Sequence, residues 1–556
     1  SVAVILMHPL YVDLDTIISS YSPPLPKEFQ EAASLIAVPD TSHSKPVVPG
    51  VKTLFPQTYH LPYLKFVQGE NVVHTPLKVG VMFSGGPAPG GHNVIQGLFN
   101  SLKDFHPDSS LVGFVNNGDG LTNNKSIDIT EEFLSKFRNS GGFNCIGTGR
   151  KKIVTPEAKE ACLKTAEALD LDGLVIIGGD GSNTATAILA EYFAKRRPKT
   201  SIVGVPKTID GDLQHTFLDL TFGFDTATKF YSSIISNISR DALSCKAHYH
   251  FIKLMGRSAS HIALECALQT HPNIALIGEE IAEKNLPLKT IIHKICSVIA
   301  DRAAMEKYYG VILIPEGIIE FIPEIINLIT EIESLSEYED KISRLSPESQ
   351  RLLKSFPAPI IEQILNDRDA HGNVYVSKIS VDKLLIHLVS NHLQQYFPNV
   401  PFNAISHFLG YEGRSGLPTK FDNTYGYSLG YGAGILVRNH CNGYLSTIES
   451  LACPFMKWKL RAIPVVKMFT VKQQADGTLQ PKIKKYLVDI GSTAFRKFKL
   501  YRKIWALEDS YRFLGPLQIE TPPEMHSDNF PPLTLLLNHN FWQRHQGCIE
   551  IPDTTY

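Results

Sequence analysis

The chain has 556 residues, of which 43% are hydrophobic and 20% charged, and its formal net charge at pH 7 is −1. This length suits roughly three to four average domains or two large ones, and the composition is that of a globular protein with large cores. A charge so near zero excludes the overall basic field of a nucleic-acid or membrane-surface binder. The eight cysteines form no CxxC pair or metal-ligand spacing, so we expect reduced thiols and a cytoplasmic location.

Residues 1–75 are rich in proline. Their pattern predicts irregular structure with one short helix near residues 26–36. The apolar run at residues 2–7 has neither the basic flank of a signal peptide nor the length of a membrane span. We expect this N-terminal extension to pack on the main body or on a partner subunit rather than to fold alone.

The pattern changes at residues 77–83, which form a predicted strand. A glycine-rich turn follows at residues 84–93, and a helix is predicted over residues 94–102. This order aims backbone N–H groups and a helix N-terminus at an anion, so we interpret the turn as a phosphate-binding loop. It lacks the Gly-Lys-Ser/Thr ending of the Walker pattern, and a tight strand–helix turn is the alternative.

A second glycine-rich segment carries a basic cluster. A predicted strand at residues 111–115 ends in turn residues, and glycines within residues 141–152 then frame Arg150, Lys151 and Lys152. Such a cluster can hold a phosphate group. A solvated basic loop explains this segment equally well when it is taken alone.

The strand at residues 173–177 ends in Gly-Gly-Asp-Gly-Ser-Asn, and a helix is predicted over residues 184–194. Asp180 therefore follows a strand end, where a carboxylate together with phosphate oxygens suits Mg²⁺. Asn183 is a candidate N-cap of the helix, which would be a structural role.

The strand at residues 201–205 is followed at once by polar side chains: Lys207, Thr208, Asp210 and Asp212. Ligands of an open parallel sheet bind outside the carboxyl ends of its strands. This position therefore offers a cation, a hydroxyl, a base and a metal ligand where chemistry is usually performed. A polar turn is the alternative, because aspartate and glycine are ordinary turn residues.

Further strand–helix units predict a second α/β lobe, with strands at residues 251–254, 274–277 and 310–314. The helical pattern of residues 319–392 indicates an insertion. A glycine-rich turn at residues 409–418 carries tyrosine, glutamate and arginine, which suit a hydroxylated, phosphorylated ligand. The Lys/Arg-rich residues 482–502 receive no chemical assignment.

Five short motifs occur in order: Gly-Gly-x-x-Pro-Gly at 85–90, Gly-Gly-Asp-Gly-Ser at 178–182, Pro-Lys-Thr-Ile-Asp-Gly-Asp at 206–212, Met-Gly-Arg at 255–257 and Tyr-Glu-Gly-Arg at 411–414. Each is weak alone, but the ordered set resembles the phosphofructokinase family over most of the chain. The length and the insertion resemble its long, pyrophosphate-dependent branch. The resemblance implies an α/β fold of two doubly wound, Rossmann-like lobes with a mainly helical insertion and an N-terminal extension.

The resemblance also implies a division of the chain after residues 1–75. Residues 76–221 would form a donor-binding lobe, completed by residues 413–490. Residues 222–412 would form a sugar-phosphate-binding lobe that includes the helical insertion at residues 319–395. Residues 491–556 would form a C-terminal segment packing on the second lobe.

The implied reaction is the Mg²⁺-dependent phosphorylation of fructose 6-phosphate at its 1-hydroxyl in glycolysis, giving fructose 1,6-bisphosphate reversibly from pyrophosphate. Asp210 matches the family's proton acceptor, since a carboxylate near a hydroxyl takes its proton as it attacks phosphorus. Lys207 and Thr208 complete the catalytic set, and Asp180 matches the Mg²⁺ ligand.

Other matched positions bind the two substrates. The donor-binding set is Gly86, Arg150, Gly181, Ser182 and Lys207. The sugar-phosphate set is Thr208, Ile209, Asp210, Asp212, Met255, Gly256, Arg257, Glu279, Tyr411, Glu412, Gly413 and Arg414. Within it, Asp212 would support metal or substrate orientation and Glu279 would contact the sugar hydroxyls.

Two departures from the family pattern bear on the donor and on subunit contacts. The pyrophosphate branch usually has aspartate at the position of Gly181, where it fills the space of an ATP α-phosphate, whereas Lys207 resembles that branch. We therefore expect pyrophosphate as donor, with ATP as the alternative. Ala247 and His248 replace the Lys-Tyr pair that reaches a partner's substrate site in long-form relatives, which weakens any cross-subunit contact.

Two other classes of protein are disfavoured. A non-catalytic regulatory subunit would not need Asp180, Asp210 and Arg414 together. A dinucleotide-binding oxidoreductase would carry G-x-G-x-x-G, which neither glycine loop follows. We expect a homodimer or higher homo-oligomer, because substrate sites of this family lie near subunit contacts, and we expect no nucleic-acid or membrane partner.

Overall fold

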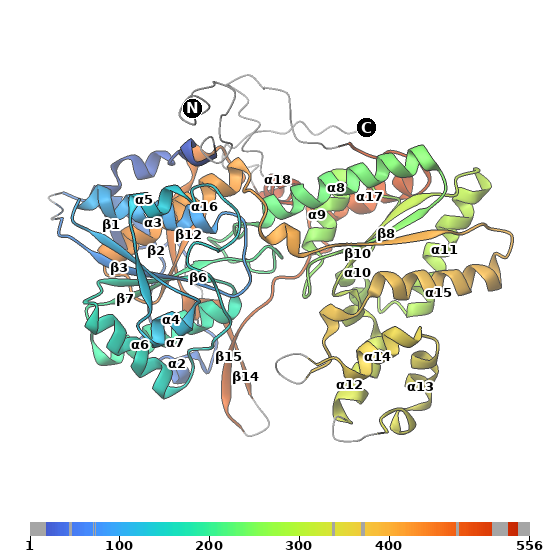
Figure 1. The fold of residues 1–556 in the computed structure, drawn as a ribbon, viewed down its shortest axis with the longest axis horizontal. Helices are drawn as coiled ribbons and strands as arrows, with labels where there is room; N and C mark the ends of the chain where they lie inside the picture. Colours follow the sequence, from blue (N-terminus) through green and yellow to red (C-terminus); the bar gives the residue numbers. More distant parts are fainter. Residues whose placement is uncertain are drawn as a thin grey trace, which may run out of the picture.

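The computed structural model describes residues 18–43, 47–70, 72, 74–335, 340–368, 373–473, 477–513 and 532–542. Two α/β lobes lie side by side, the first built on a nine-stranded sheet and the second on a four-stranded sheet (Figure 1). The predicted α/β class is therefore confirmed. No helix in these ranges is both long enough and apolar enough to cross a membrane.

The first sheet has a parallel centre and antiparallel edges. Its strands are, in spatial order, β1 (Leu35–Pro39), β2 (Leu64–Gln68), β13 (Lys459–Pro464), β12 (Tyr444–Glu449), β7 (Ser201–Pro206), β6 (Gly173–Gly178), β3 (Lys78–Ser84), β4 (Ser110–Phe114) and β5 (Ser126–Ile129). Every residue of β6 and β7 is buried, as expected of parallel strands covered by helices on both faces.

Strands β1 and β2 correct the expectation of irregular structure in residues 1–75. They pair antiparallel, and β2 joins the sheet through β13. Leu64 and Phe66 of β2 are buried with an exposed residue between them, a period-two pattern that the surrounding prolines obscured. The expected helix is a 3₁₀ helix, η2 (Lys27–Ser34), and α2 (Val51–Leu54) follows β1. Residues 1–17 lie outside the described part.

Helices cover both faces of the first sheet (Figure 1). One face carries α3 (Gly91–Phe105) and α16 (Lys420–Arg438), and the other carries α4 (Gly118–Thr122), α6 (Pro156–Ala168) and α7 (Asp180–Arg196); the short α5 (Glu131–Ser135) follows β5. Helices α3 and α16 touch backbone to backbone. A Cβ built at Gly430 would lie 1.8 Å from the carbonyl oxygen of Val94, and one at Gly97 would lie 2.0 Å from that of Tyr427.

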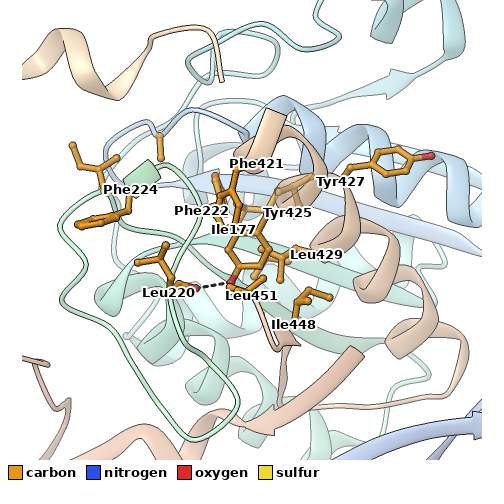
Figure 2. Packing of buried hydrophobic residues seen from close by; sticks show 14 of the residues in the cluster. Ile177, Leu220, Phe222, Phe224, Phe421, Tyr425, Tyr427, Leu429, Ile448 and Leu451 are labelled. Atoms are coloured by element: carbon orange, nitrogen blue, oxygen red, sulfur yellow. Dashed lines mark hydrogen bonds between the residues drawn. The ribbon is translucent and has the colours of Figure 1, made fainter. Parts of the chain in front are cut away.

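Figure 2 shows the core where α16 meets the sheet. Phe421 and Tyr425 of α16 are fully buried there with Ile177 of β6. The Tyr425 hydroxyl donates to the carbonyl oxygen of Leu220 at 2.5 Å. This bond gives the buried hydroxyl group a hydrogen-bond partner, while the aromatic ring packs against apolar side chains.

Replacing Gly430 with alanine is expected to destabilise the chain by about 2–4 kcal/mol, because the added methyl group meets backbone that cannot move aside. The urea midpoint, followed by far-ultraviolet circular dichroism, should fall accordingly. Gly416→Ala is the control, since the nearest atom to a Cβ there lies at 3.9 Å. Equal midpoints for the two variants would show that the helix contact is not tight.

The second sheet is entirely parallel. Its spatial order is β11 (Ala404–Leu409), β8 (Tyr249–Leu254), β10 (Gly310–Pro315) and β9 (Ile274–Ala275). One side carries α8 (Phe224–Cys245), α9 (His261–Thr270) and α17 (Thr493–Leu507), and the other carries α10 (Gly278–Glu283), α11 (Leu288–Ala304) and α15 (Val381–Tyr396) (Figure 1). Helix α18 (Leu533–Trp542) packs against α9 and α17.

The stretch between β10 and β11 is helical, as the sequence predicts. It contains η3 (Ile318–Phe321), α12 (Pro323–Ser334), η4 (Ile342–Arg344), α13 (Pro347–Lys354), α14 (Ala358–Asn366), η5 (Val376–Lys378) and α15. Helices α12, α13 and α14 project away from the second sheet (Figure 1).

A hairpin and a connecting segment link the first lobe back to the second. After η7 (Phe455–Lys457), β13 and η8 (Val465–Met468), β14 (Phe469–Gln473) and β15 (Leu479–Ile483) form an antiparallel hairpin. Residues 484–488, which we call the strap, then lead toward α17. In the same part of the chain Cys453 is disulfide-bonded, so the expectation of reduced thiols is wrong at that position.

Candidate active site

Three predicted loops meet at one edge of the first sheet. Strands β3, β6 and β7 are neighbours, and their last residues, Ser84, Gly178 and Pro206, stand in register. The glycine turn, the Asp180 segment and the Lys207–Asp212 segment therefore begin side by side. This is the carboxyl edge at which parallel sheets bind ligands.

The glycine turn between β3 and α3 is shaped for close approach. Gly85 has φ +83° and Gly90, the N-cap of α3, has φ +101°, values that favour glycine. The Gly85 N–H donates to the Gly149 carbonyl at 2.9 Å, which places exposed Arg150 next to the turn. A Cβ built at Gly86 would lie 3.3 Å from Cζ of Arg414. The turn is thus lined by a guanidinium group.

Asp180 lies in the first turn of α7, because the helix begins at Asp180 rather than at residue 184 as expected. An aspartate there is stabilised by the helix dipole. Asn183 lies inside the helix, and Gly179 is the N-cap, so the capping role expected of Asn183 is wrong. Burial raises the pKa of Asp180, which Lys485 partly offsets. Its Oδ1 is buried and makes no hydrogen bond with any described residue.

Thr208, Asp210 and Asp212 form a small network in the loop after β7. The Thr208 hydroxyl accepts from the Asp210 N–H at 3.0 Å and donates to Asp212 at 3.3 Å. Burial, and then the charge of Asp212, raise the pKa of Asp210 to about 7. A carboxylate tuned to this range is suited to act as a general base at neutral pH.

Lys207 is a buried cation between the glycine turn and the carboxylates. The residue as a whole is 7% exposed, and its Nζ would lie 3.8 Å from a Cβ built at Gly85. Burial lowers the pKa of Lys207 to about 8, against the opposing effect of Asp210. The ammonium group is thus placed to face a phosphate held by the turn.

Gly181 and Ser182 follow Asp180 in the first turn of α7. Ser182 is buried, and its hydroxyl lies 3.4 Å from the Ser84 carbonyl, so it braces the end of β3. A Cβ built at exposed Gly181 would meet no atom of the described residues within 4 Å. The position next to the metal-ligand candidate is therefore open.

The sugar-side candidates come from the second lobe. Met255 is buried at the end of β8, and Gly256 has φ +128° with its N–H donating to Glu316 at 3.2 Å. Arg257 is exposed beside a cavity of about 470 Å³ that reaches the helical insertion. Glu279 in α10 accepts from the N–H groups of Ser260 and Val488, while its buried Oε2 has no hydrogen-bond partner among the described residues.

The Tyr-Glu-Gly-Arg motif forms a short 3₁₀ helix, η6 (Tyr411–Arg414), after β11. Tyr411 is 62% exposed, and Arg414 stacks over its ring at 4.8 Å. Glu412 accepts from the Gly410 N–H, which stabilises the loop itself. Gly413 packs under Tyr231, and Ile209 belongs to the core. The structure thus brings Arg414 to Gly86, and leaves Tyr411 and Arg257 at the surface.

Lys485 of the strap is a site residue that sequence reasoning missed. Its Nζ lies 2.5 Å from Oδ2 of Asp180 and also bonds Oδ2 of Asp212. In the sequence it is one of many cations in residues 482–502, and nothing in the pattern marks it. Only the fold brings it to the carboxylates.

A tuned carboxylate, a buried lysine and a glycine turn at one edge of a parallel sheet define a phosphotransferase site, in which positioning and charge neutralisation carry the catalysis. A sequence model described as phosphofructokinase matches residues 78–437, more than half of the chain. The chain belongs to the phosphofructokinase family.

Relatives extend the likeness beyond that range. The chain is 41% identical to the pyrophosphate–fructose 6-phosphate 1-phosphotransferase of Porphyromonas gingivalis, over 94% of this chain and 98% of that protein. The enzyme of the same name from Entamoeba histolytica is 40% identical over the same shares. The subunit beta of the Solanum tuberosum enzyme with this name is 44% identical, over 85% of each chain.

Solved structures agree on the fold. The pyrophosphate-dependent phosphofructokinase of Nitrosospira multiformis has a TM-score of 0.53 at 15% identity, covering 82% of this chain and 96% of its own. That of Marinobacter aquaeolei also has a TM-score of 0.53 at 15% identity, covering 78% and 93%. At this identity the likeness shows the Rossmann-like fold alone.

Proposed function

We propose that the protein transfers a phosphoryl group reversibly between pyrophosphate and the 1-hydroxyl of fructose 6-phosphate, as part of glycolysis. The observation that carries this proposal is Asp210, a carboxylate whose pKa is raised to about 7. It lies in the same loop after β7 as the buried cation Lys207. The names of the relatives at about 40% identity support the same substrates.

In this reaction the 1-hydroxyl oxygen attacks phosphorus, and a new O–P bond forms as the bond to the bridging oxygen of pyrophosphate breaks. Asp210 takes the hydroxyl proton, and phosphate leaves. Lys207 offsets negative charge on the transferred group, and the glycine turn lets backbone N–H groups approach the donor. Glu279 would accept from sugar hydroxyls through its Oε2, which has no hydrogen-bond partner in the described part of the chain. Arg414 and Tyr411 would contact the sugar phosphate.

Asp180, with Asp212, would hold Mg²⁺. The residues fit this ion, because Oδ1 of Asp180 is buried without a hydrogen-bond partner among the described residues, and carboxylate oxygens are hard ligands. No group of three or more candidate ligands gathers within the described ranges, which suits an ion that takes further oxygens from phosphate and water. When bound, Mg²⁺ would neutralise phosphate charge.

The lobes would divide the substrates, with the donor on the first lobe (residues 76–221 and 413–490) and the sugar phosphate on the second (residues 222–412). We also propose a homo-oligomer. Strand β11 is the edge of the second sheet, and it exposes Ile405 (38%) and Phe408 (40%), which suits a second copy better than water. Plant relatives are named as subunits.

ATP is the second candidate donor, and Gly181 favours it. A side chain at this position would stand beside the metal ligand, whereas glycine leaves the space open. An adenosine-carrying donor therefore meets no steric block there.

The test is a coupled assay of the purified chain with Mg²⁺, fructose 6-phosphate and either donor. We expect fructose 1,6-bisphosphate from pyrophosphate, with a kcat/KM at least about tenfold above that with ATP. The reverse reaction, started with fructose 1,6-bisphosphate and phosphate, should release pyrophosphate. No product from either donor would refute the proposal, and product from ATP alone would favour the second candidate.

A further inference from the structure

The strap is fixed to both lobes at the candidate site. The N–H of Tyr486 donates to the Asp212 carbonyl at 2.8 Å, in the first lobe. Its carbonyl accepts from Nε2 of His261 at 2.9 Å, in the second lobe, and the two rings stack at 5.3 Å. The N–H of Val488 donates to Glu279 at 3.0 Å. The backbone next to Lys485 is therefore fixed by hydrogen bonds to both lobes, and this holds the Lys485 side chain at the site.

The Lys485 ammonium bridges two carboxylates from different elements. Asp180 comes from the first turn of α7 and Asp212 from the loop after β7. Both use Oδ2 toward Lys485. The Asp212 side chain is only 2% exposed and the Asp180 side chain 25% exposed, so water screens their mutual repulsion poorly. One lysine thus offsets two negative charges that would otherwise repel.

These are the same two carboxylate groups that would hold a divalent cation. Lys485 contacts their Oδ2 atoms, whereas Oδ1 of Asp180 has no hydrogen-bond partner in the described part of the chain. An ammonium group on a flexible four-carbon stem is a point charge with three donors, and it can leave one acceptor for another. Phosphate oxygens of a donor at the glycine turn would be such acceptors. Once Mg²⁺ neutralises the two carboxylates, they would no longer need the positive charge of Lys485. The negatively charged phosphates of the donor would then be a better partner for the ammonium.

We propose, on the basis of the phosphotransferase activity proposed above, that Lys485 is a positioning residue of the donor site. Its ammonium pairs Asp180 with Asp212 and competes with a divalent ion for these two carboxylates, and it moves onto the phosphate oxygens of the donor when the donor binds.

The experiment compares Lys485→Met with Lys485→Arg and with Lys484→Met, a control that removes an exposed neighbouring cation. Binding of Mn²⁺ to the full chain without donor is followed by electron paramagnetic resonance of the free ion. We expect Lys485→Met to bind Mn²⁺ at least about tenfold more tightly than wild type, because the competing charge is gone. Lys485→Arg and Lys484→Met should match wild type.

The KM for magnesium pyrophosphate, measured at saturating fructose 6-phosphate, tests whether the Lys485 ammonium binds the donor. It should rise at least about tenfold in Lys485→Met and stay near wild type in Lys484→Met. Unchanged or weaker Mn²⁺ binding by Lys485→Met would overturn the competition, and an unchanged KM would overturn the transfer to the donor.

Two further measurements keep the test decisive. Lys485→Gln, which is neutral but still donates to one carboxylate, should shift Mn²⁺ binding in the same direction if Lys485→Met does not fold. Mn²⁺ should also raise the thermal midpoint of Lys485→Gln more than that of wild type. Mn²⁺ binding can be measured without turnover, so the two proposals can fail separately. A chain that is inactive with every donor would refute the proposed function. Tighter Mn²⁺ binding by Lys485→Met in that same chain would still support the competition between Lys485 and the ion.

Discussion

Replacing Asp210 with asparagine is expected to lower kcat by about 10²- to 10⁴-fold, the range that a general base contributes. Asparagine keeps the shape of the side chain but cannot take the hydroxyl proton. The KM for fructose 6-phosphate should change less than about threefold, because the loss falls on the transition state. Initial rates from the coupled assay measure both constants.

The control for this variant is Asp219→Asn. Asp219 also has its pKa raised by burial, to about 6, and its carboxylate accepts from the Leu451 N–H. An asparagine can accept from the same N–H, so kcat should stay within about threefold of wild type. If Asp210→Asn retained a similar rate, Asp210 would not be the base.

The pH dependence of the wild-type rate follows from the same site. Asp210 must be ionised to act, so activity should be lost as the pH falls through its pKa of about 7. Lys207 acts as a cation, so activity should fall again as the pH rises through its pKa of about 8. We expect a narrow optimum between these values in kcat/KM. The acid limb should be absent from the residual rate of Asp210→Asn.

The second large effect is expected at Gly181. Gly181→Asp should lower any ATP-dependent kcat/KM by about 100-fold or more, since like charges brought together cost several kcal/mol. The aspartate fits without strain, because a Cβ there meets no atom within 4 Å among the residues that the structure describes. An acid in the first turn of α7 is also favoured by the helix dipole. The pyrophosphate-dependent kcat/KM should stay within about fivefold, because pyrophosphate has no α-phosphate to displace.

Gly181→Ala adds only a Cβ, so comparing it with Gly181→Asp separates the effect of added volume from the effect of added charge. It should leave both donor activities within about threefold of wild type. Equal losses with ATP and pyrophosphate in Gly181→Asp would show that residue 181 does not decide between the two donors. Parallel assays with the two donors on all three proteins provide the measurement.

Much of the site could be predicted because its loops are local. Asp180 and Asp210 each follow a strand within a few residues, and parallel strand ends share an edge, so their meeting needs no long-range information. Lys485 could not be found in this way, since 273 residues separate it from Asp212. Its place depends on the hairpin and on backbone bonds to both lobes, which leave no mark on the local pattern.

The fold shows the same limit. Buried central strands such as β6 are uninterrupted apolar runs and are readily predicted. Strands β1 and β2 are short and lie among prolines, and they join the sheet only through the pairing of β2 with β13, which is distant in sequence. The early start of α7 escapes prediction because glycines at residues 178–181 suggest a loop. Of these glycines only Gly181 is helical, since Gly178 ends β6 and Gly179 is the extended N-cap, and the Ser182 hydroxyl packs against the end of β3.

The backbone contact between α3 and α16 constrains how the site can move. Helix α3 begins directly after the glycine turn, and α16 begins six residues after Arg414. Because Gly97 and Gly430 let the two helices touch without intervening side chains, neither can slide without breaking close packing. The glycine turn is therefore attached to a rigid pair of helices, whereas Arg414 follows β11 of the second sheet. A change in the distance between the glycine turn and the second lobe would therefore require one lobe to move against the other, which would strain the strap because its backbone is bonded to both.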